Sequence, residues 1–105
     1  MDGLSAKQRA HLRGLGHALK PLLHVGKEGV TPEATAALAE ALSTRELLKV
    51  RVLESAPEAA RESAHSLADH VAGVHVIHVV GRNALLYRAH PERPAIRLPQ
   101  PRKRA

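Results

Sequence analysis

Helix-start signals alternate with short apolar runs along the first 90 residues, and this alternation restricts the fold more than any other feature. Residues 5–8 (S-x-x-Q) form a capping box, which predicts a first helix. Residues 31–33 (T-P-E) combine an N-cap, a proline at the first helical position and an acid in the first turn, so they predict a second helix. A further box at 55–58 (S-x-x-E) predicts a third helix, which ends at Gly73.

Four apolar runs between these signals predict strands, at residues 22–25, 47–53, 74–80 and 84–88. The order of elements is therefore α-β-α-β-α-β-β. Two connections that contain a helix favour parallel pairing, whereas the turn at 81–83 favours an antiparallel hairpin. The length of 105 residues fits one domain. We expect a single α/β domain over residues 1–90 with a mixed four-stranded sheet.

The spacing of apolar side chains predicts which faces are buried. The apolar face of the first helix consists of Leu12, Leu15 and Leu19. Pro21 is expected to end that helix, because proline cannot continue it. The run at 47–53 alternates, which places Lys49 and Arg51 on the face opposite its apolar residues.

Composition excludes several classes of function. The chain has no cysteine, so disulfides, thiolate zinc sites, iron–sulfur clusters and cysteine nucleophiles are excluded. Phe and Trp are absent and Tyr87 is the single tyrosine, which argues against recognition of bases on aromatic platforms. No nucleophile-elbow or phosphate-loop motif is present, and no two histidines have the spacing that chelation favours. We expect no enzyme, no metal, no cofactor and no small-molecule substrate.

The sequence also shows no recognisable targeting signal. The first residues contain no basic region followed by an apolar run, and no apolar stretch approaches the ~20 residues of a membrane span. We expect no secretory signal and no membrane partner, and a cytoplasmic location.

Charge is distributed unevenly along the chain, whose net charge is +6. Basic residues dominate 1–29 and 93–105, whereas acidic residues dominate 30–72. Separated basic regions make a polyanionic partner a candidate. The alternative is that the high arginine content reflects only the base composition of the source genome.

The loop Gly26-Lys27-Glu28-Gly29, between a predicted strand and a capped helix, is a candidate phosphate site. Its glycines allow close backbone approach, the helix offers N–H groups, and Lys27 adds a cation. GXXG loops clamp nucleic-acid backbones in this way. The alternative is a plain strand-to-helix turn, and the acidic Glu28 favours that alternative.

Further cations could extend this site over a basic surface. Arg9, Arg13 and Lys20 are predicted on one face of the first helix, where no acid between Asp2 and Glu28 neutralises them. The remaining candidates lie on or beside the later strands: Lys49, Arg51, Arg82 and Arg88. The alternative for each set is an ordinary solvated face.

Several segments together resemble a CRM domain, named for chloroplast RNA splicing and ribosome maturation. These segments are LSAKQRAHLR at 4–13, LKP at 19–21, VGKEGVT at 25–31, ELLKVRV at 46–52 and VGRxxLLYR at 80–88. They occur in the expected order and spacing over residues 4–90. A chain of this size is similar to the stand-alone bacterial YhbY-like RNA-binding proteins.

The resemblance implies a two-layer α/β domain like the C-terminal domain of a bacterial translation initiation factor. It implies RNA binding through residues 26–29, Arg82 and the neighbouring basic surface. It also implies association with the precursor of large-subunit ribosomal RNA, within a pre-ribosomal particle, during ribosome assembly.

Two other functions stay open. The acidic middle of the chain could bind a basic ribosomal protein, which would make the chain a protein-interaction adaptor. A DNA-binding accessory role ranks last, because no helix-turn-helix is recognisable. Residues 91–105 lie outside the family pattern; they are rich in Arg and Pro, so we expect a flexible basic tail.

Overall fold

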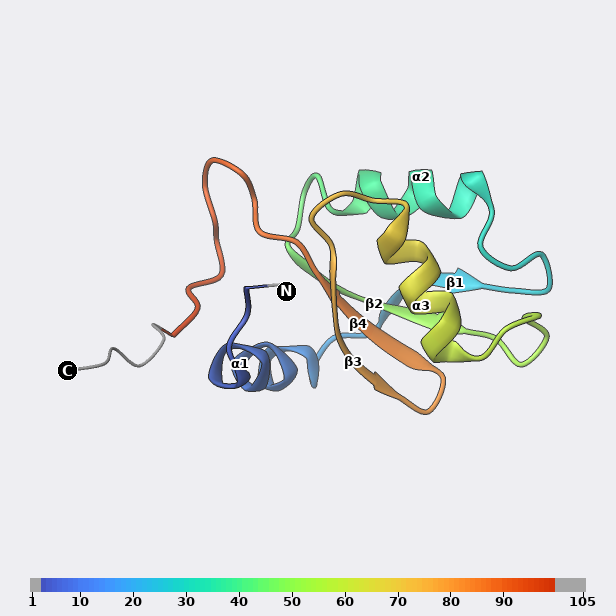
Figure 1. Ribbon diagram of the computed structural model, residues 1–105, viewed down its shortest axis with the longest axis horizontal. Helices are drawn as coiled ribbons and strands as arrows, with labels where there is room; N and C mark the ends of the chain where they lie inside the picture. Colours follow the sequence, from blue (N-terminus) through green and yellow to red (C-terminus); the bar gives the residue numbers. More distant parts are fainter. Residues whose placement is uncertain (1–2, 100–105) are drawn as a thin grey trace.

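Four strands form one mixed sheet in the order β1-β2-β4-β3 (Figure 1). The structure is a computed structural model that describes residues 3–99. The strands are β1 (Pro21–Val25), β2 (Leu47–Val52), β3 (His75–Val80) and β4 (Asn83–Tyr87). β1 pairs with β2 in parallel, and β4 pairs with both β2 and β3 in antiparallel. β2 and β4 are the most buried strands, as expected for the two central strands of the sheet.

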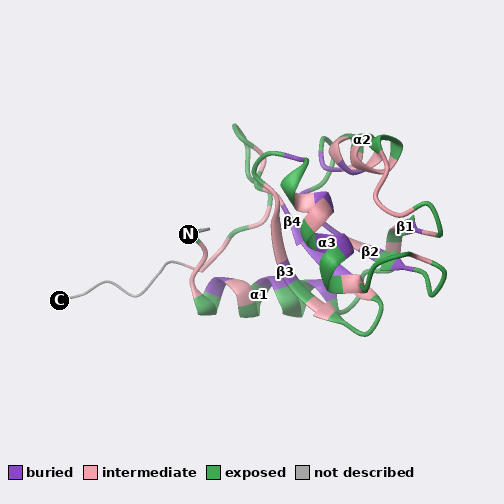
Figure 2. Ribbon diagram, turned by 45° about the vertical axis from the view of Figure 1, so that its right-hand side comes forward, coloured by how far each residue is buried: buried purple, intermediate pink, exposed green. Residues whose placement is uncertain are grey.

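Two helices, α2 (Pro32–Ala41) and α3 (Ala60–Asp69), cover one face of this sheet (Figures 1 and 2). Leu38 of α2 and Leu67 of α3 are fully buried in one core with Val50 of β2. Thr31 caps α2, since its side-chain oxygen accepts a hydrogen bond from the Ala34 N–H at 3.0 Å. The main hydrophobic core lies in this layer.

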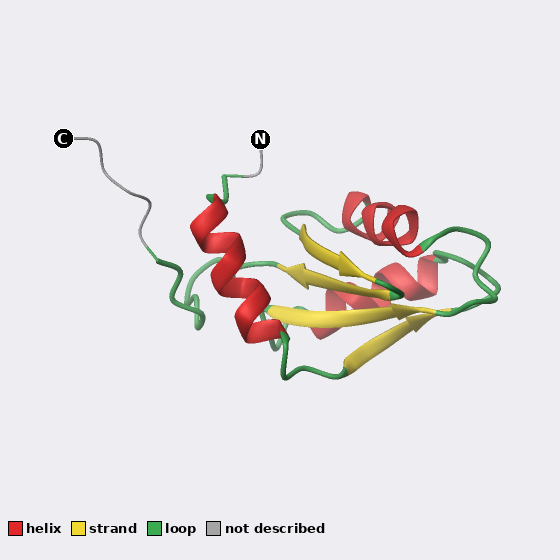
Figure 3. Ribbon diagram, turned by 90° about the horizontal axis from the view of Figure 1, so that it is seen from below, coloured by secondary structure: helices red, strands yellow, loops and turns green. Residues whose placement is uncertain are grey.

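The remaining helix, α1 (Ala6–Gly16), packs on the opposite face (Figure 3). Leu12 is fully buried in a second core with Leu47, Ile77, Leu85 and Tyr87. α1 crosses only one end of this face and leaves the rest without a helix. The expected α/β class and mixed four-stranded sheet are confirmed, and α1 adds a partial third layer to the two layers that the resemblance implies.

The buried face of α1 differs from the expected one. Gln8, Leu12 and Gly16 are buried, whereas Leu15 and Leu19 are 42% and 36% exposed. Residues four apart lie within about 40° of each other on a helix, so the line through 8, 12 and 16 faces the sheet. The helix ends at Gly16, before Lys20, and Pro21 opens β1 instead of ending α1.

Of the two predicted capping boxes, one is confirmed and one is wrong. Ser5 and Gln8 exchange side-chain-to-backbone hydrogen bonds of 3.1 and 2.9 Å. Ser55 and Glu58 do not cap α3, whose N-cap is Ala59, without a side-chain hydrogen bond. Proline disfavours helical backbone in the residue before it, so Pro57 prevents a helix that begins directly after Ser55.

The chain beyond β4 returns to the domain. The carboxylate of Glu46 is buried and accepts hydrogen bonds from the backbone N–H groups of His90, Ala95 and Ile96, at 2.5, 2.9 and 2.7 Å. Ile96 and Leu98 pack against the second core. Residues 91–99 of the expected tail therefore contact the domain, and residues 100–105 lie outside the described residues.

Candidate nucleic-acid interface

The sheet face beside α1 carries basic side chains where the helix does not cover it. On β2, Leu47 lies beneath α1, and the next residues on the same face are Lys49, which is half-buried, and Arg51, which is exposed. This alternation was predicted from the sequence. Lys49 and Arg51 are therefore brought together on one uncovered surface, about 7 Å apart along the strand.

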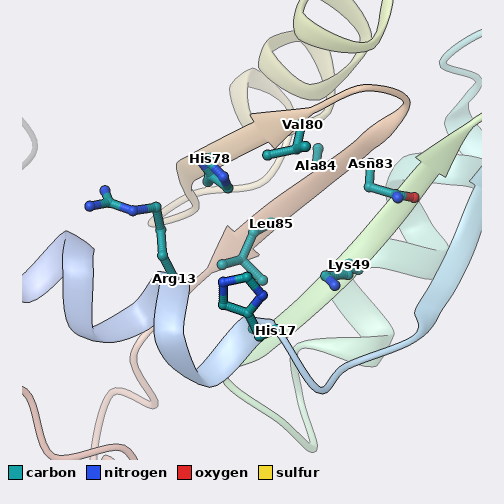
Figure 4. A pocket seen from close by; sticks show the side chains of 9 residues that line it. Arg13, His17, Lys49, His78, Val80, Asn83, Ala84 and Leu85 are labelled. Atoms are coloured by element: carbon teal, nitrogen blue, oxygen red, sulfur yellow. The ribbon is translucent and has the colours of Figure 1, made fainter.

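A groove of about 160 Å³ lies between the C-terminal half of α1 and this surface (Figure 4). Its polar lining consists of Arg13, His17, Lys49, His78 and Asn83. Leu85 of β4 extends toward His17 in the close view. Among the residues that the structure describes, no acid lines this groove, which makes it suited to an anionic ligand.

The candidate loop at 26–29 connects β1 to α2, and Gly29 has a structural role in it. Gly29 has a φ of +75°, and its N–H donates to the Gly26 carbonyl at 2.9 Å. A Cβ at Gly29 would lie 3.0 Å from Cγ of Pro57. Turn geometry and packing thus both require glycine at 29, so the Gly29 amide is committed to the turn.

Lys27 and Glu28 lie at the exposed end of this loop. Among residues 3–99, neither of their backbone N–H groups has a protein acceptor. The loop therefore presents one cation, one anion and two available donors. This arrangement permits phosphate binding, and it equally permits a solvated turn.

The β3–β4 turn and residues 53–59 lie at the same end of the sheet as this loop (Figure 1). The Val52 N–H donates to the Arg82 carbonyl at 2.7 Å, and the Leu53 N–H donates to the Val25 carbonyl at 2.8 Å. The Arg82 guanidinium lies 3.6 Å from the carboxylate of Glu54, and both side chains are largely exposed. Such a pair contributes little to stability, so Arg82 can exchange Glu54 for another anion.

Three of the predicted cations lie away from the first groove and from the loop at 26–29: Arg9, Lys20 and Arg88. Arg9 donates from Nη1 to the Val76 carbonyl at 3.1 Å, at the free edge of β3. Lys20 is exposed in the connection to β1 and does not continue a helical stripe. Arg88 follows β4 at the far end of the sheet, about 20 Å from Arg82 at the spacing of a strand. The predicted Arg9, Arg13 and Lys20 stripe is therefore not a single face.

His75 and Tyr87 form a mostly buried pair near Arg9. Their rings stack with centroids 6.2 Å apart. Burial, and next the positive charge of Arg9, lower the pKa of His75 below its ordinary 6.5. His75 therefore adds no positive charge to the surface near pH 7, and Tyr87, only 3% exposed, offers no ring to a base.

Sequence reasoning missed two histidines of the groove. His17 directly follows α1, and its role depends on where that helix ends. His78 follows a bulge between Val76 and His78, which breaks the alternation of β3. Helical spacing does place His17, four residues after Arg13, beside that cation, whereas no local signal places His78 in the groove.

Other kinds of site find no support in residues 3–99. No three His, Cys, Asp or Glu side chains gather there in a way that could hold a metal ion. No helix in that range has the length and apolar character needed to cross a membrane.

The comparisons with known proteins point to one family. Residues 4–88 match the CRS1 / YhbY (CRM) domain. A Bacillus subtilis protein named "Probable RNA-binding protein YqeI" is 35% identical over 96 residues, covering 91% of this chain and 99% of that protein. A Haemophilus influenzae protein named "RNA-binding protein" is 32% identical over 92 residues, covering 88% and 92%.

A solved structure agrees with these sequence matches. The solution structure of a hypothetical protein from Staphylococcus aureus has a TM-score of 0.76 and 31% identity, covering 91% of this chain and 99% of that one. Family model, relatives and structure all span most of the chain. The chain therefore belongs to the CRS1/YhbY (CRM) domain family.

Proposed function

We propose that this chain binds RNA, with the phosphate backbone held between α1 and the uncovered face of the sheet. The observation that carries this proposal is the groove of Arg13 and Lys49, which no acid from the described range 3–99 lines. The names of the relatives from B. subtilis and H. influenzae support RNA as the polyanion.

The RNA path runs from the groove toward the loop at 26–29. Arg51 lies on the same face as Lys49, and the end of β2 reaches the loop about 10 Å beyond Lys49. Lys27 and Arg82 are the cations at that end. With Phe and Trp absent and Tyr87 buried, recognition rests on phosphate and ribose contacts instead of base stacking.

The proposed RNA is the precursor of large-subunit ribosomal RNA in an assembling particle in the cytoplasm, and the role is binding without catalysis. Family membership supports this choice of partner. Crosslinking in cells followed by sequencing of the bound RNA tests it. Recovery of large-subunit precursor supports the choice, whereas recovery of only messenger or transfer RNA overturns it.

Lys49→Gln tests the groove itself. One lost phosphate contact lowers the slope of log affinity against log salt by about 0.7 and weakens binding about fivefold near 0.1 M salt. Arg45→Gln is the matched control, because Arg45 is exposed and lines neither described groove. Equal affinities for both variants and the unaltered chain would contradict the proposed surface.

Competition with duplex DNA separates RNA binding from a DNA-binding role.

The adaptor function has its own surface. Glu33 and Glu40 are exposed on α2, seven residues apart and so on one helix face, on the side of the sheet away from the groove. A basic ribosomal protein bound there would lose affinity in a Glu33→Gln/Glu40→Gln variant. RNA affinity would not fall in that variant, which distinguishes the two functions.

A further inference from the structure

The free edge of β3 lies between α1 on one face of the sheet and α3 on the other. Within the described part of the chain, β3 pairs only with β4, and its second edge has no neighbouring strand. A second groove, of about 410 Å³, follows this edge. Its charged or titratable lining consists of Arg9, Arg61, His65 and His78, and no acidic side chain among residues 3–99 lines it.

Arg61 is the unexpected member of this groove. It is the only Lys or Arg between Arg51 and Arg82, in a part of the chain where acids predominate. Arg61 lies on the side of α3 that faces the edge of β3, where it lines this groove. His65 is four residues further along α3 and so lies on the same side.

The two grooves meet at His78, which lines both of them. Arg13 and Arg9 are likewise four residues apart on α1, with Arg13 at the first groove and Arg9 at the second. A chain of cations and histidines thus runs from Lys49, across β3, to Arg61.

An added peptide strand fits this edge poorly. The bulge at Val76 and His78 interrupts the regular spacing that strand addition requires. The Val76 carbonyl already accepts a hydrogen bond from Arg9. Cationic side chains on both sides of the edge instead complement a phosphate backbone, whose charges need no backbone register.

We propose that the RNA strand held in the first groove continues over the edge of β3 at His78 and places a phosphate against Arg61 and His65 of α3. This inference rests on the proposed function. It extends the interface from the α1 face to the helix layer on the other side of the sheet.

The test measures binding of a labelled single-stranded RNA of about 16 nucleotides, the upper end of the site sizes of single-strand binders, by fluorescence anisotropy at several salt concentrations. Arg61→Gln should weaken binding about fivefold near 0.1 M salt and lower the salt slope by about 0.7. Arg61→Lys should recover most of this loss, because it keeps the charge. Arg45→Gln again serves as the matched control.

The outcomes separate this inference from the proposed function. If Arg61→Gln binds like the unaltered chain while Lys49→Gln binds more weakly, the second groove is overturned and the proposed function stands. If Arg45→Gln loses as much as Arg61→Gln, the effect is one of net charge and the second groove is again overturned. If the unaltered chain binds no RNA, both fail. Arg61 is exposed, and circular dichroism checks that the variants remain folded.

Discussion

At the scale of single residues, Glu46 shows how one carboxylate can organise a distant segment. Burial opposes its ionisation, but hydrogen bonds from the N–H groups of His90, Ile96 and Ala95 outweigh burial and lower its pKa below the ordinary 4.5. These donors lie 44 to 50 residues away in the sequence. Nothing local to Glu46 could have predicted them.

Glu46→Gln should destabilise the protein by about 1–3 kcal/mol. The substitution replaces one carboxylate oxygen, which accepts a backbone hydrogen bond, with an amide nitrogen that can only donate, so a buried backbone N–H loses its acceptor. Urea unfolding at pH 7 measures this difference. A difference near zero would mean that the contacts with residues 90–96 add nothing to stability.

The same variant predicts a pH dependence. Since folding lowers the pKa of Glu46, its stabilising contribution is fully present above about pH 4.5 and is lost as pH falls through the lower pKa of the folded state. The stability difference between the unaltered chain and Glu46→Gln should therefore shrink below about pH 4.5. Taking the difference cancels the titration of groups common to both proteins, such as His75. A constant difference from pH 7 to 3 would contradict this assignment.

The loop at 26–29 offers a test that leaves the fold intact. Gly29→Val would distort the turn and meet Pro57, so lost binding in that variant could not be assigned to RNA contact. Lys27 and Glu28 are both exposed, and their side chains can be neutralised without such strain. Lys27→Gln should weaken RNA binding about fivefold near 0.1 M salt, whereas Glu28→Gln should keep or slightly raise affinity. Wild-type affinity in both variants would establish a plain turn.

At the scale of elements, predictions succeeded where signals are local. The caps at Ser5 and Thr31 and the alternation of β2 depend only on neighbouring residues, and all three are confirmed. The predicted start of α3 was wrong, because Pro57 prevents the helix that the capping pattern at 55–58 indicates. The predicted buried face of α1 was wrong, because the glycines at 14 and 16 have no side chain and add nothing to the apolar pattern. Close packing of Gly16 against Leu85 decides which side is buried.

Gly16 should therefore limit how closely α1 approaches the sheet. A Cβ at Gly16 would lie 2.7 Å from Cδ2 of the buried Leu85, so Gly16→Val must displace α1 or Leu85 and should cost about 1–3 kcal/mol. Gly14 is the matched control: a Cβ there meets nothing within 4 Å. Gly14→Val should change stability by less than about 0.5 kcal/mol, since valine is the better helix former. Thermal unfolding compares them, and equal losses would contradict the packing explanation.

At the scale of the whole molecule, the sequence could predict the basic residues but not their grouping. Lys49 and Arg51 share a face because strands alternate, whereas the proximity of Lys49 to Arg13 depends on α1 packing opposite α2 and α3. Arg88 and Arg82 are close in sequence but lie at opposite ends of β4. Long-range packing decides such groupings, and no local pattern encodes it.

The C-terminal boundary of the domain follows from the same long-range contacts. Truncation after His90 removes two donors to Glu46, the apolar side chains of Ile96 and Leu98, and the Pro99 carbonyl that accepts a hydrogen bond from Gln8 at 3.0 Å. We expect a loss of about 2–4 kcal/mol, which lowers the unfolding temperature by roughly 10 °C or more in a domain of this size.

Truncation after Pro99 separates this structural role from charge. It keeps every described contact of residues 91–99 and removes Arg102, Lys103 and Arg104. The unfolding temperature should therefore stay within a few degrees of the intact chain, while the salt slope of RNA binding falls by up to about 2, since each lost phosphate contact contributes about 0.7. Calorimetry and salt-dependent titration of both truncations measure the two effects. A segment that donates to Glu46 and packs against the second core cannot be removed without a loss of stability. If truncation after His90 also leaves the unfolding temperature unchanged, residues 91–99 add no stability and act only as a charged arm.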